Sequence, residues 1–215
     1  GYAVSGKVLP AEPGKIAEFH LGANVEIAPD GKHLLSKIEG RPVLESSGKI
    51  RVDEVVYLKN IDYSTGNVDF PGSVIVEESV ADGFKLKASG SIILQSSVGV
   101  CEISAGKDVI LSAGFMGRGE GKIISEGDVY ARFVEQGTIE AKGSIFVSEA
   151  VLHSRLIAGK AIVVKGGRGD INGGELSAGT YLQCNKLGGA GETKTIVTVG
   201  IDPSVRAVID EILAS

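Results

Sequence analysis

Apolar residues return at regular intervals along the middle of the chain. One short phrase recurs between residues 50 and 184, and it is clearest in residues 86–94 and 139–147. Its first aliphatic residue recurs about every 18 residues, at Ile50, Val68, Leu86, Ile103, Ile123, Ile139, Leu156 and Leu176. A fixed period in this range is the signature of a repeat architecture, in which each repeat stacks on its neighbours.

Two further positions of the repeat are apolar in every copy. The sixth residue after each start is Val56, Val74, Ile92, Val109, Val129, Ile145, Ile162 or Leu182. The eighth is Leu58, Val76, Leu94, Leu111, Ala131, Val147, Val164 or Cys184. Alternating apolar residues are typical of half-buried strands. Glycines four residues after several starts (Gly90, Gly127, Gly143) predict corners where the chain bends.

These patterns predict an all-β fold, a single-stranded β-helix with about eight coils of about 18 residues each, where a coil is one circuit of the chain around the axis. Coils stacked at a strand spacing of about 4.8 Å would form a rod about 38 Å long. The alternative is an antiparallel sandwich with regularly spaced strands. We favour the β-helix, because a sandwich gives no reason for a small residue and a glycine to recur at fixed offsets.

The two ends of the chain lack the repeat. Residues 1–49 form a separate region of short antiparallel strands with a hairpin turn at residues 29–31, predicted to cap the first coil, since an open coil end is an unpaired strand edge. The β-helix is expected over residues 50–200, with a closing strand at residues 196–199.

Residues 201–215 are predicted to begin a C-terminal helix. Asp202 suits the N-cap position and Pro203 the first helical position. One face of this helix would be apolar, with Val205, Val208, Ile209, Ile212 and Leu213. Such a face would suit packing on the last coil or a coiled coil. Because the chain does not begin with Met and stops within this pattern, we expect it to be part of a longer protein.

Charge and cysteine content indicate which partners and which compartment suit the protein. The net charge of −5 and the pI near 5.3 argue against nucleic acid and anionic membranes as partners. The sequence contains no run of 18 apolar residues and no signal-peptide pattern. Cys101 and Cys184 fall in different positions of distant repeats, so free thiols are expected. Together these features predict a cytoplasmic protein.

The glycine-rich segments are better explained by corners than by phosphate binding. Residues 114–121 and 166–174 are predicted to be corner insertions, which form the best candidate contact surface of a solenoid. Residues 188–195 superficially resemble a P-loop, but Glu192 stands where the lysine should be and a strand pattern follows. The Arg168-Gly-Asp170 tripeptide is interpreted as chance.

No group of residues predicts catalysis or metal binding. His20 and His33 lie in the N-terminal region, and none of the three histidines has a zinc-site spacing to cysteine. His153 is the one candidate general base, because some solenoid acyltransferases use a corner histidine. Asp108 and Asp128 occupy nearly equivalent repeat positions, whereas Asp170 does not, so clustered carboxylates for sugar cleavage are not indicated. We predict no catalytic, cofactor-binding or metal-binding residues.

Several phrases of the chain resemble the flagellar assembly protein A family. They are the opening Gly-Tyr-Ala-Val-Ser-Gly-Lys-Val, the Asp62-Tyr-Ser-Thr-Gly-Asn67 phrase, residues 80–88, the repeated Ala-x-Gly-x-Ile steps, and the Ile201-Asp-Pro203 exit. The resemblance covers nearly the whole chain. It implies a bacterial cytoplasmic protein with a right-handed β-helix similar to the bactofilins, flanked by an N-terminal domain and a C-terminal coiled coil.

The resemblance also implies a non-enzymatic role in flagellar assembly or polar organisation. We therefore expect a scaffold whose partners are proteins, either flagellar or cell-pole components or further copies of itself in a homo-oligomer. The alternative is a β-helix enzyme, acyltransferase-like or carbohydrate-active. A deep polar pocket that holds His153 and carboxylates from adjacent coils would favour that alternative.

Overall fold

The computed structural model describes residues 1–8, 19–189 and 193–200. The contacts within the chain separate two units. The first unit comprises Gly1–Ile38 and Pro42–Val52, and the second comprises Glu39–Arg41 and the chain from Asp53 onward. The C-terminal helix predicted for residues 201–215 lies outside the described residues.

The first unit contains short strands in two small sheets. A three-stranded sheet has the order β1-β5-β4, and a two-stranded sheet pairs β2 with β3. The strands are β1 (His20–Leu21), β2 (Val25–Ile27), β3 (Leu34–Ser36), β4 (Arg41–Leu44) and β5 (Lys49–Asp53). The β2–β3 pair is antiparallel, which confirms the predicted hairpin around residues 29–31.

Not every pair in this unit follows the antiparallel expectation. Strand β1 pairs with β5 in parallel, and Leu21 lies opposite Ile50. The repeat start that the sequence placed at Ile50 therefore pairs with β1 of the first unit.

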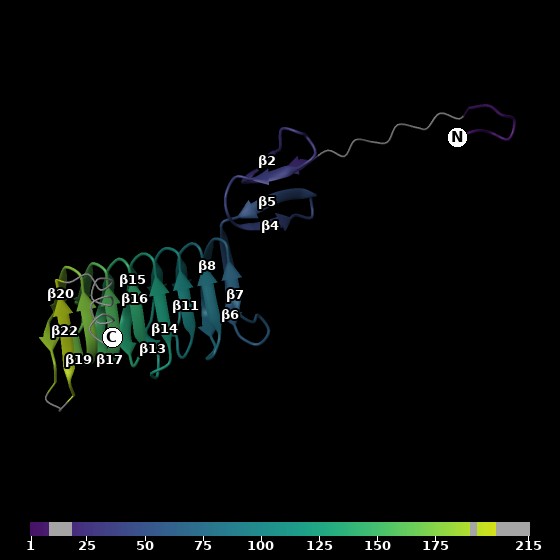
Figure 1. Cartoon of the computed structure of the whole chain (residues 1–215). Helices are drawn as coiled ribbons and strands as arrows, with labels where there is room; N and C mark the ends of the chain where they lie inside the picture. Colours follow the sequence, from purple (N-terminus) through teal and green to yellow (C-terminus); the bar gives the residue numbers. More distant parts are fainter. Residues whose placement is uncertain (9–18, 190–192, 201–215) are drawn as a thin grey trace, which may run out of the picture. The chain divides into compact units, whose positions relative to one another are not determined.

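The second unit is a β-solenoid of about eight coils, in which the chain climbs from β6 to β22 (Figure 1). The pairings between successive coils are parallel. The strands are β6 (Val55–Ile61), β7 (Val68–Phe70), β8 (Ser73–Val80), β9 (Lys85–Ala88), β10 (Ile92–Leu94), β11 (Glu102–Ala105), β12 (Val109–Leu111), β13 (Phe115–Met116), β14 (Lys122–Ser125), β15 (Val129–Glu135), β16 (Thr138–Ala141), β17 (Ile145–Ala158), β18 (Ala161–Val164), β19 (Asp170–Ala178), β20 (Tyr181–Cys184), β21 (Lys186–Leu187) and β22 (Thr195–Val199).

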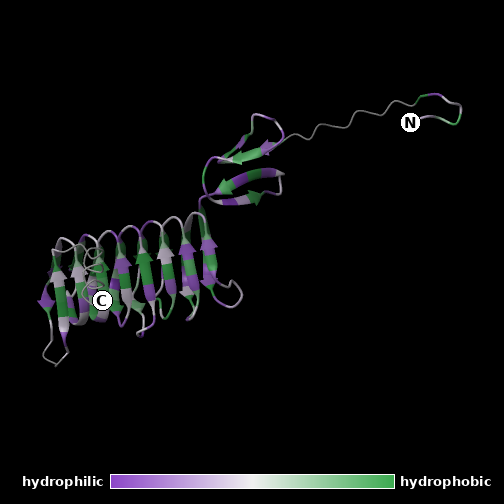
Figure 2. Cartoon of the chain, in the orientation of Figure 1, coloured by the Kyte–Doolittle hydropathy of each residue, from purple (hydrophilic) through white to green (hydrophobic). Residues whose placement is uncertain are grey.

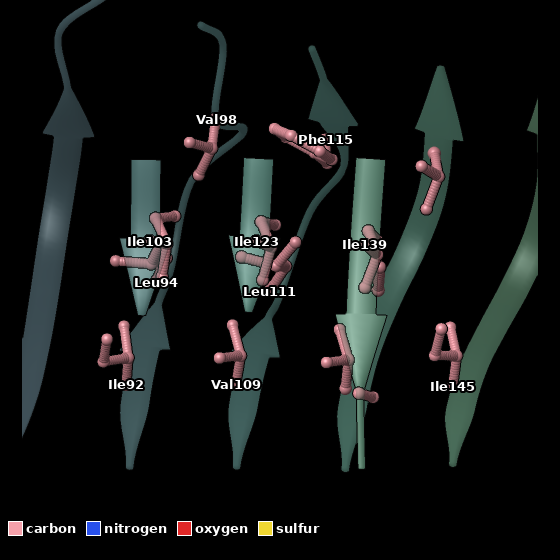
Figure 3. Close-up of a cluster of buried hydrophobic side chains, with 14 of the residues drawn as sticks. Ile92, Leu94, Val98, Ile103, Val109, Leu111, Phe115, Ile123, Ile139 and Ile145 are labelled. Carbon is pink, nitrogen blue, oxygen red and sulfur yellow. The ribbon is translucent and has the colours of Figure 1, made fainter. Parts of the chain in front are cut away.

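The predicted apolar positions form continuous ladders inside the solenoid. On the first strand of each coil the starts pair in register from Val68 to Leu176, and Val197 of β22 closes this ladder. On the second strand all eight residues from Val56 to Leu182 pair in register. Figure 3 shows these rows, with Ile103, Ile123 and Ile139 on the first strand and Ile92, Val109 and Ile145 on the second.

The coils also have a third strand, whose inward residues fall in no column of the repeat. Val98 bridges to Phe115, and Val134, Val151 and Ile171 follow in register, all of them fully buried. Leu187 continues this row in the last coil, where it is 52% exposed.

The corner-insertion prediction holds in part, because residues 118–120 and 166–168 are exposed turns with left-handed backbone at Arg118, Gly119, Gly166 and Gly167. It is wrong for Phe115 of residues 114–121 (Figure 3) and for Ile171 of residues 166–174, which are buried strand residues.

Gly121 and Gly137 of the next coil make room for the ring of Phe115. Phe115 is fully buried. A Cβ atom added to Gly137 would lie 2.4 Å from this ring, and one added to Gly121 would lie 2.8 Å from it. Both distances are shorter than side chains tolerate. The glycine-rich pattern therefore serves packing across adjacent coils.

Polar side chains at one set of corners also connect the coils. The Oδ1 atom of Asp108 accepts a hydrogen bond of 2.8 Å from the amide of Asp128 in the next coil. Asp128 in turn accepts 2.7 Å from the amide of Ser144. Asp82 accepts 2.8 Å from Val100 at another corner. Such links satisfy amides at which the strand ladder is interrupted.

Candidate interaction surface

His153 lies in a notch that offers little for catalysis. It occupies a corner with a left-handed backbone (φ 46°), as does Gln136 of the preceding coil (φ 47°). The notch has a volume of about 410 Å³ and is lined by Arg118, Gly119, Gln136, Gly137, Thr138, His153 and Arg155, with no carboxylate among these residues. The polar pocket with carboxylates that would favour the enzyme alternative is therefore not formed around His153.

The two arginines of the notch are already paired with acidic groups. Arg118 lies 2.9 Å from an oxygen of Asp82, and Arg155 lies 3.6 Å from an oxygen of Glu175. A general base needs a partner that orients it and a substrate proton within reach. No carboxylate and no nucleophilic side chain of the notch lining orients His153 in this way.

The aspartates singled out from the sequence have structural roles. Asp108 and Asp128 hold the amides of the next coil, so they are more than the solvated corner charges expected from the sequence. Asp170 begins β19 on the third strand, away from this column. Among the described residues no three His, Cys, Asp or Glu side chains are grouped so that they could hold a metal ion.

The two cysteines are free thiols with different exposure. Cys101 is buried (5% exposed), whereas Cys184 is half-buried. Burial, together with the nearby charge of Asp82, raises the pKa of the Cys101 thiol to about 12. Burial also raises the pKa of Cys184.

We expect Cys101 to resist alkylation at pH 8 while Cys184 reacts first. The thiolate is the nucleophile, and a thiol with a pKa near 12 is almost entirely protonated at this pH. Iodoacetamide labelling of the native chain, followed by peptide mass spectrometry, measures both rates. Labelling in denaturant, in which both thiols react, is the control. Equal native rates would contradict the burial of Cys101.

A row of apolar side chains runs along the outside of the second strands. Each lies between two inward ladder residues and therefore points away from the core. We call this row the apolar stripe; it consists of Tyr57, Ile75, Ile93, Ile110, Tyr130, Phe146 and Val163, which pair in register through seven successive coils. Gln183 occupies the same position in the next coil and ends the stripe.

The apolar stripe is exposed at Tyr57 and Tyr130 and half-buried at its other five residues, and its aromatic end borders a groove. Tyr57 is 66% exposed and Tyr130 is 40% exposed. The rings of Tyr130 and Phe146 stack with their centroids 5.0 Å apart and an interplanar angle of 12°. A groove of about 340 Å³ lies over these rings and Val163. Figure 2 shows that apolar residues alternate with polar ones along the strands of the solenoid.

Polar residues border the apolar stripe on the side where each second strand ends. The border residues are exposed and comprise Lys59, Glu77, Gln95, Ser112, Arg132, Ser148 and Lys165. Arg132 is paired with Glu149 at 2.7 Å, whereas Lys165 has no ion-pair partner within the described ranges. A continuous apolar row with a polar rim is typical of a surface that binds another polypeptide.

The sequence carries a signal for the apolar stripe that lies between the two apolar positions of the second strand. The clearest copies have three consecutive apolar residues on the second strand, Ile92-Ile93-Leu94 and Ile145-Phe146-Val147. Strict alternation places the middle residue on the solvent side. Comparing these middle residues between copies would have found the stripe.

The described part of the chain contains no helix that is long and apolar enough to cross a membrane. No curated protein and no solved structure matches the chain significantly. Two family models match it: the flagellar assembly protein A β-solenoid domain over residues 54–215, and the N-terminal region of the same protein over residues 1–47. These matches confirm the resemblance drawn from the sequence phrases. The chain belongs to the flagellar assembly protein A family, in which a β-solenoid domain follows an N-terminal region.

Proposed function

We propose that this protein is a non-enzymatic cytoplasmic scaffold for flagellar assembly or for the organisation of the cell pole. In this role the solenoid is a stiff support that holds partner proteins along its apolar stripe. The partners would be flagellar or cell-pole proteins, and self-association into a homo-oligomer is a further mode of contact. The family membership supports the flagellar context.

The observation that carries the proposal is the continuity of the apolar stripe. Exposed apolar residues are common on proteins, but a row that repeats through seven coils is a contiguous patch. At a spacing of about 4.8 Å per coil, seven residues span about 29 Å. This length suits a helix or strand of a partner laid along the stripe.

The packing between successive coils favours a rigid solenoid. Three interior ladders and the side-chain links at Asp82, Asp108 and Asp128 hold each coil to the next. A solenoid of this kind gains its stability from contacts between neighbouring coils. The enzyme alternative has no comparable support, because the lining of the His153 notch lacks a carboxylate.

The experiment that tests the proposal replaces Ile75 and Ile93 with threonine in the native gene of a flagellated host. Threonine keeps the β-branched shape and removes most of the apolar surface. Flagella per cell, counted by electron microscopy, should fall strongly while the amount of the protein stays at the wild-type level. The matched control replaces Ile124 and Ile157, two outward isoleucines on the first strands, with threonine.

A variant with both stripe substitutions that is as abundant as the wild type and builds normal flagella would overturn the proposal. Equal loss of flagella in the control would also count against it, since the apolar stripe would then have no special part.

A further inference from the structure

We propose that the aromatic end of the apolar stripe, formed by Tyr130, Phe146 and Val163, is the docking site of the chain's own segment 203–213. This inference goes beyond the proposed scaffold role, because it assigns one half of the stripe to the protein itself. The isoleucine end, with Ile75, Ile93 and Ile110, is then left for a partner.

The described chain ends close to the face that carries the apolar stripe. Strand β22 pairs with the first strand of the preceding coil, so that Val199 lies opposite Ala178 and the amide of Gly200 donates 3.1 Å to the carbonyl of Ala178. In that preceding coil the chain continues from Gly179 into β20, which lies on the stripe face. The described chain therefore ends, at Gly200, beside the corner that leads onto this face.

The sequence does not allow the strand ladder to continue beyond β22. If the register of β22 were continued, Pro203 would fall opposite Leu182 of β20. Proline has no amide hydrogen and cannot donate to a ladder, whereas it suits the first position of a helix. The sequence thus favours a change from strand to helix beside the end of the apolar stripe.

The segment 203–213 matches the aromatic end of the apolar stripe in length and in apolar pattern. Residues 203–213 would form a helix about 16 Å long. Three coil spacings, from Gln183 to Tyr130, amount to about 14 Å. The predicted apolar face carries Val205, Val208, Ile209 and Ile212, which suits a narrow apolar row. A single helix about 10 Å wide matches one row of side chains better than a broad subunit interface does.

The segment and the border of the groove carry opposite charges. The segment 201–215 contains Asp202, Asp210, Glu211 and one arginine, Arg206, which gives a net charge of −2. The groove beside Tyr130 and Phe146 is bordered by Arg132 and Lys165. Lys165 has no ion-pair partner among residues 1–8, 19–189 and 193–200. An acidic amphipathic helix would therefore complement the border of this groove.

The test is hydrogen exchange of the segment in the full chain, measured by peptide mass spectrometry. Amides of residues 205–212 should exchange at least about tenfold more slowly than in the free 201–215 peptide, because docking stabilises a helix that is too short to persist alone. Replacing both Tyr130 and Phe146 with threonine should abolish this protection. The Ile124→Thr and Ile157→Thr control should keep it. Both pairs of substitutions are outward and spare the interior ladders.

Every outcome decides the question. Protection that is absent in the wild type, that survives in the aromatic variant, or that is lost in the control variant as well, would overturn the docking site. Protection that fades on dilution by about tenfold would assign the segment to a second copy and overturn intramolecular docking. Concentration-independent protection that is lost only in the aromatic variant supports it. Flagellar counts play no part in this readout, so its failure is distinguishable from failure of the scaffold proposal.

Discussion

Replacing Ile145 with aspartate is expected to unfold the solenoid. Ile145 is fully buried and pairs with Val129 and Ile162 in the adjacent coils. The substitution removes a buried aliphatic side chain and places an unpaired carboxylate in the ladder, at a combined cost of about 5 kcal/mol or more. Whole domains are stable by only about 5–15 kcal/mol. In thermal melting followed by circular dichroism, the variant should therefore either show no cooperative transition or melt at a much lower temperature than the wild type.

The matched control for this variant is Ser148→Asp. Ser148 belongs to the same strand, β17, but it is exposed. The same new charge should there change the melting temperature by little, since surface substitutions usually stay within about 0.5 kcal/mol. If Ile145→Asp melts like the wild type, the assignment of the second-strand ladder to the core is wrong.

Replacing Phe115 with alanine is expected to lower the free energy of unfolding by about 3–5 kcal/mol, the usual cost of removing a buried aromatic ring. Phe115 is fully buried between Val98 and Val134 on the third strand. If residues 114–121 were a solvent-exposed corner insertion, the same change would cost no more than about 0.5 kcal/mol. Urea unfolding therefore distinguishes the two descriptions.

The glycines around Phe115 provide a second, independent check. Gly137→Ala alone should destabilise the solenoid, because the new Cβ would lie 2.4 Å from the Phe115 ring. In the Phe115→Ala background much of this cost should disappear, since the smaller side chain leaves space for the methyl group. Such a coupling between two contacting residues is measured by a double-mutant cycle. Additive effects of the two substitutions would contradict the packing described for this corner.

The interior ladders could be predicted because they depend only on short-range alternation. Val129, Ile145 and Ile162 recur at fixed offsets from the repeat starts, and a strand with one buried face must place apolar residues at every second position. The hairpin at residues 29–31 was predictable for a similarly local reason, since Pro-Asp-Gly is a turn sequence.

The inward column of the third strand escaped prediction because the corner before it varies in length. Val134 follows the repeat start Ile123 by 11 residues, whereas Ile171 follows the start Leu156 by 15. An alignment anchored on the starts therefore scatters these residues over several positions. Only the pairing of whole coils brings Val134, Val151 and Ile171 into one ladder.

The candidate surface was partly visible in the sequence and partly not. The outward apolar residues Ile93 and Phe146 stand in the clearest copies of the phrase, so their column could have been read directly. The roles of Asp108 and Asp128 could not, because an aspartate that accepts a hydrogen bond from the next coil looks in sequence like any solvated corner charge. The geometry of the corner decides whether the aspartate accepts this hydrogen bond or stays solvated. That geometry is set by the stacking of the coils.

The interior ladders determine how the length of the solenoid changes when a repeat is gained or lost. Leu86, Ile103 and Ile139 are all accommodated in the same interior position, and each coil contacts mainly the coils before and after it. A duplication or deletion of one whole phrase would thus preserve the fit on either side of the event. The solenoid would grow or shrink in increments of about 4.8 Å. The number of phrases encoded in the gene therefore sets the length of the solenoid.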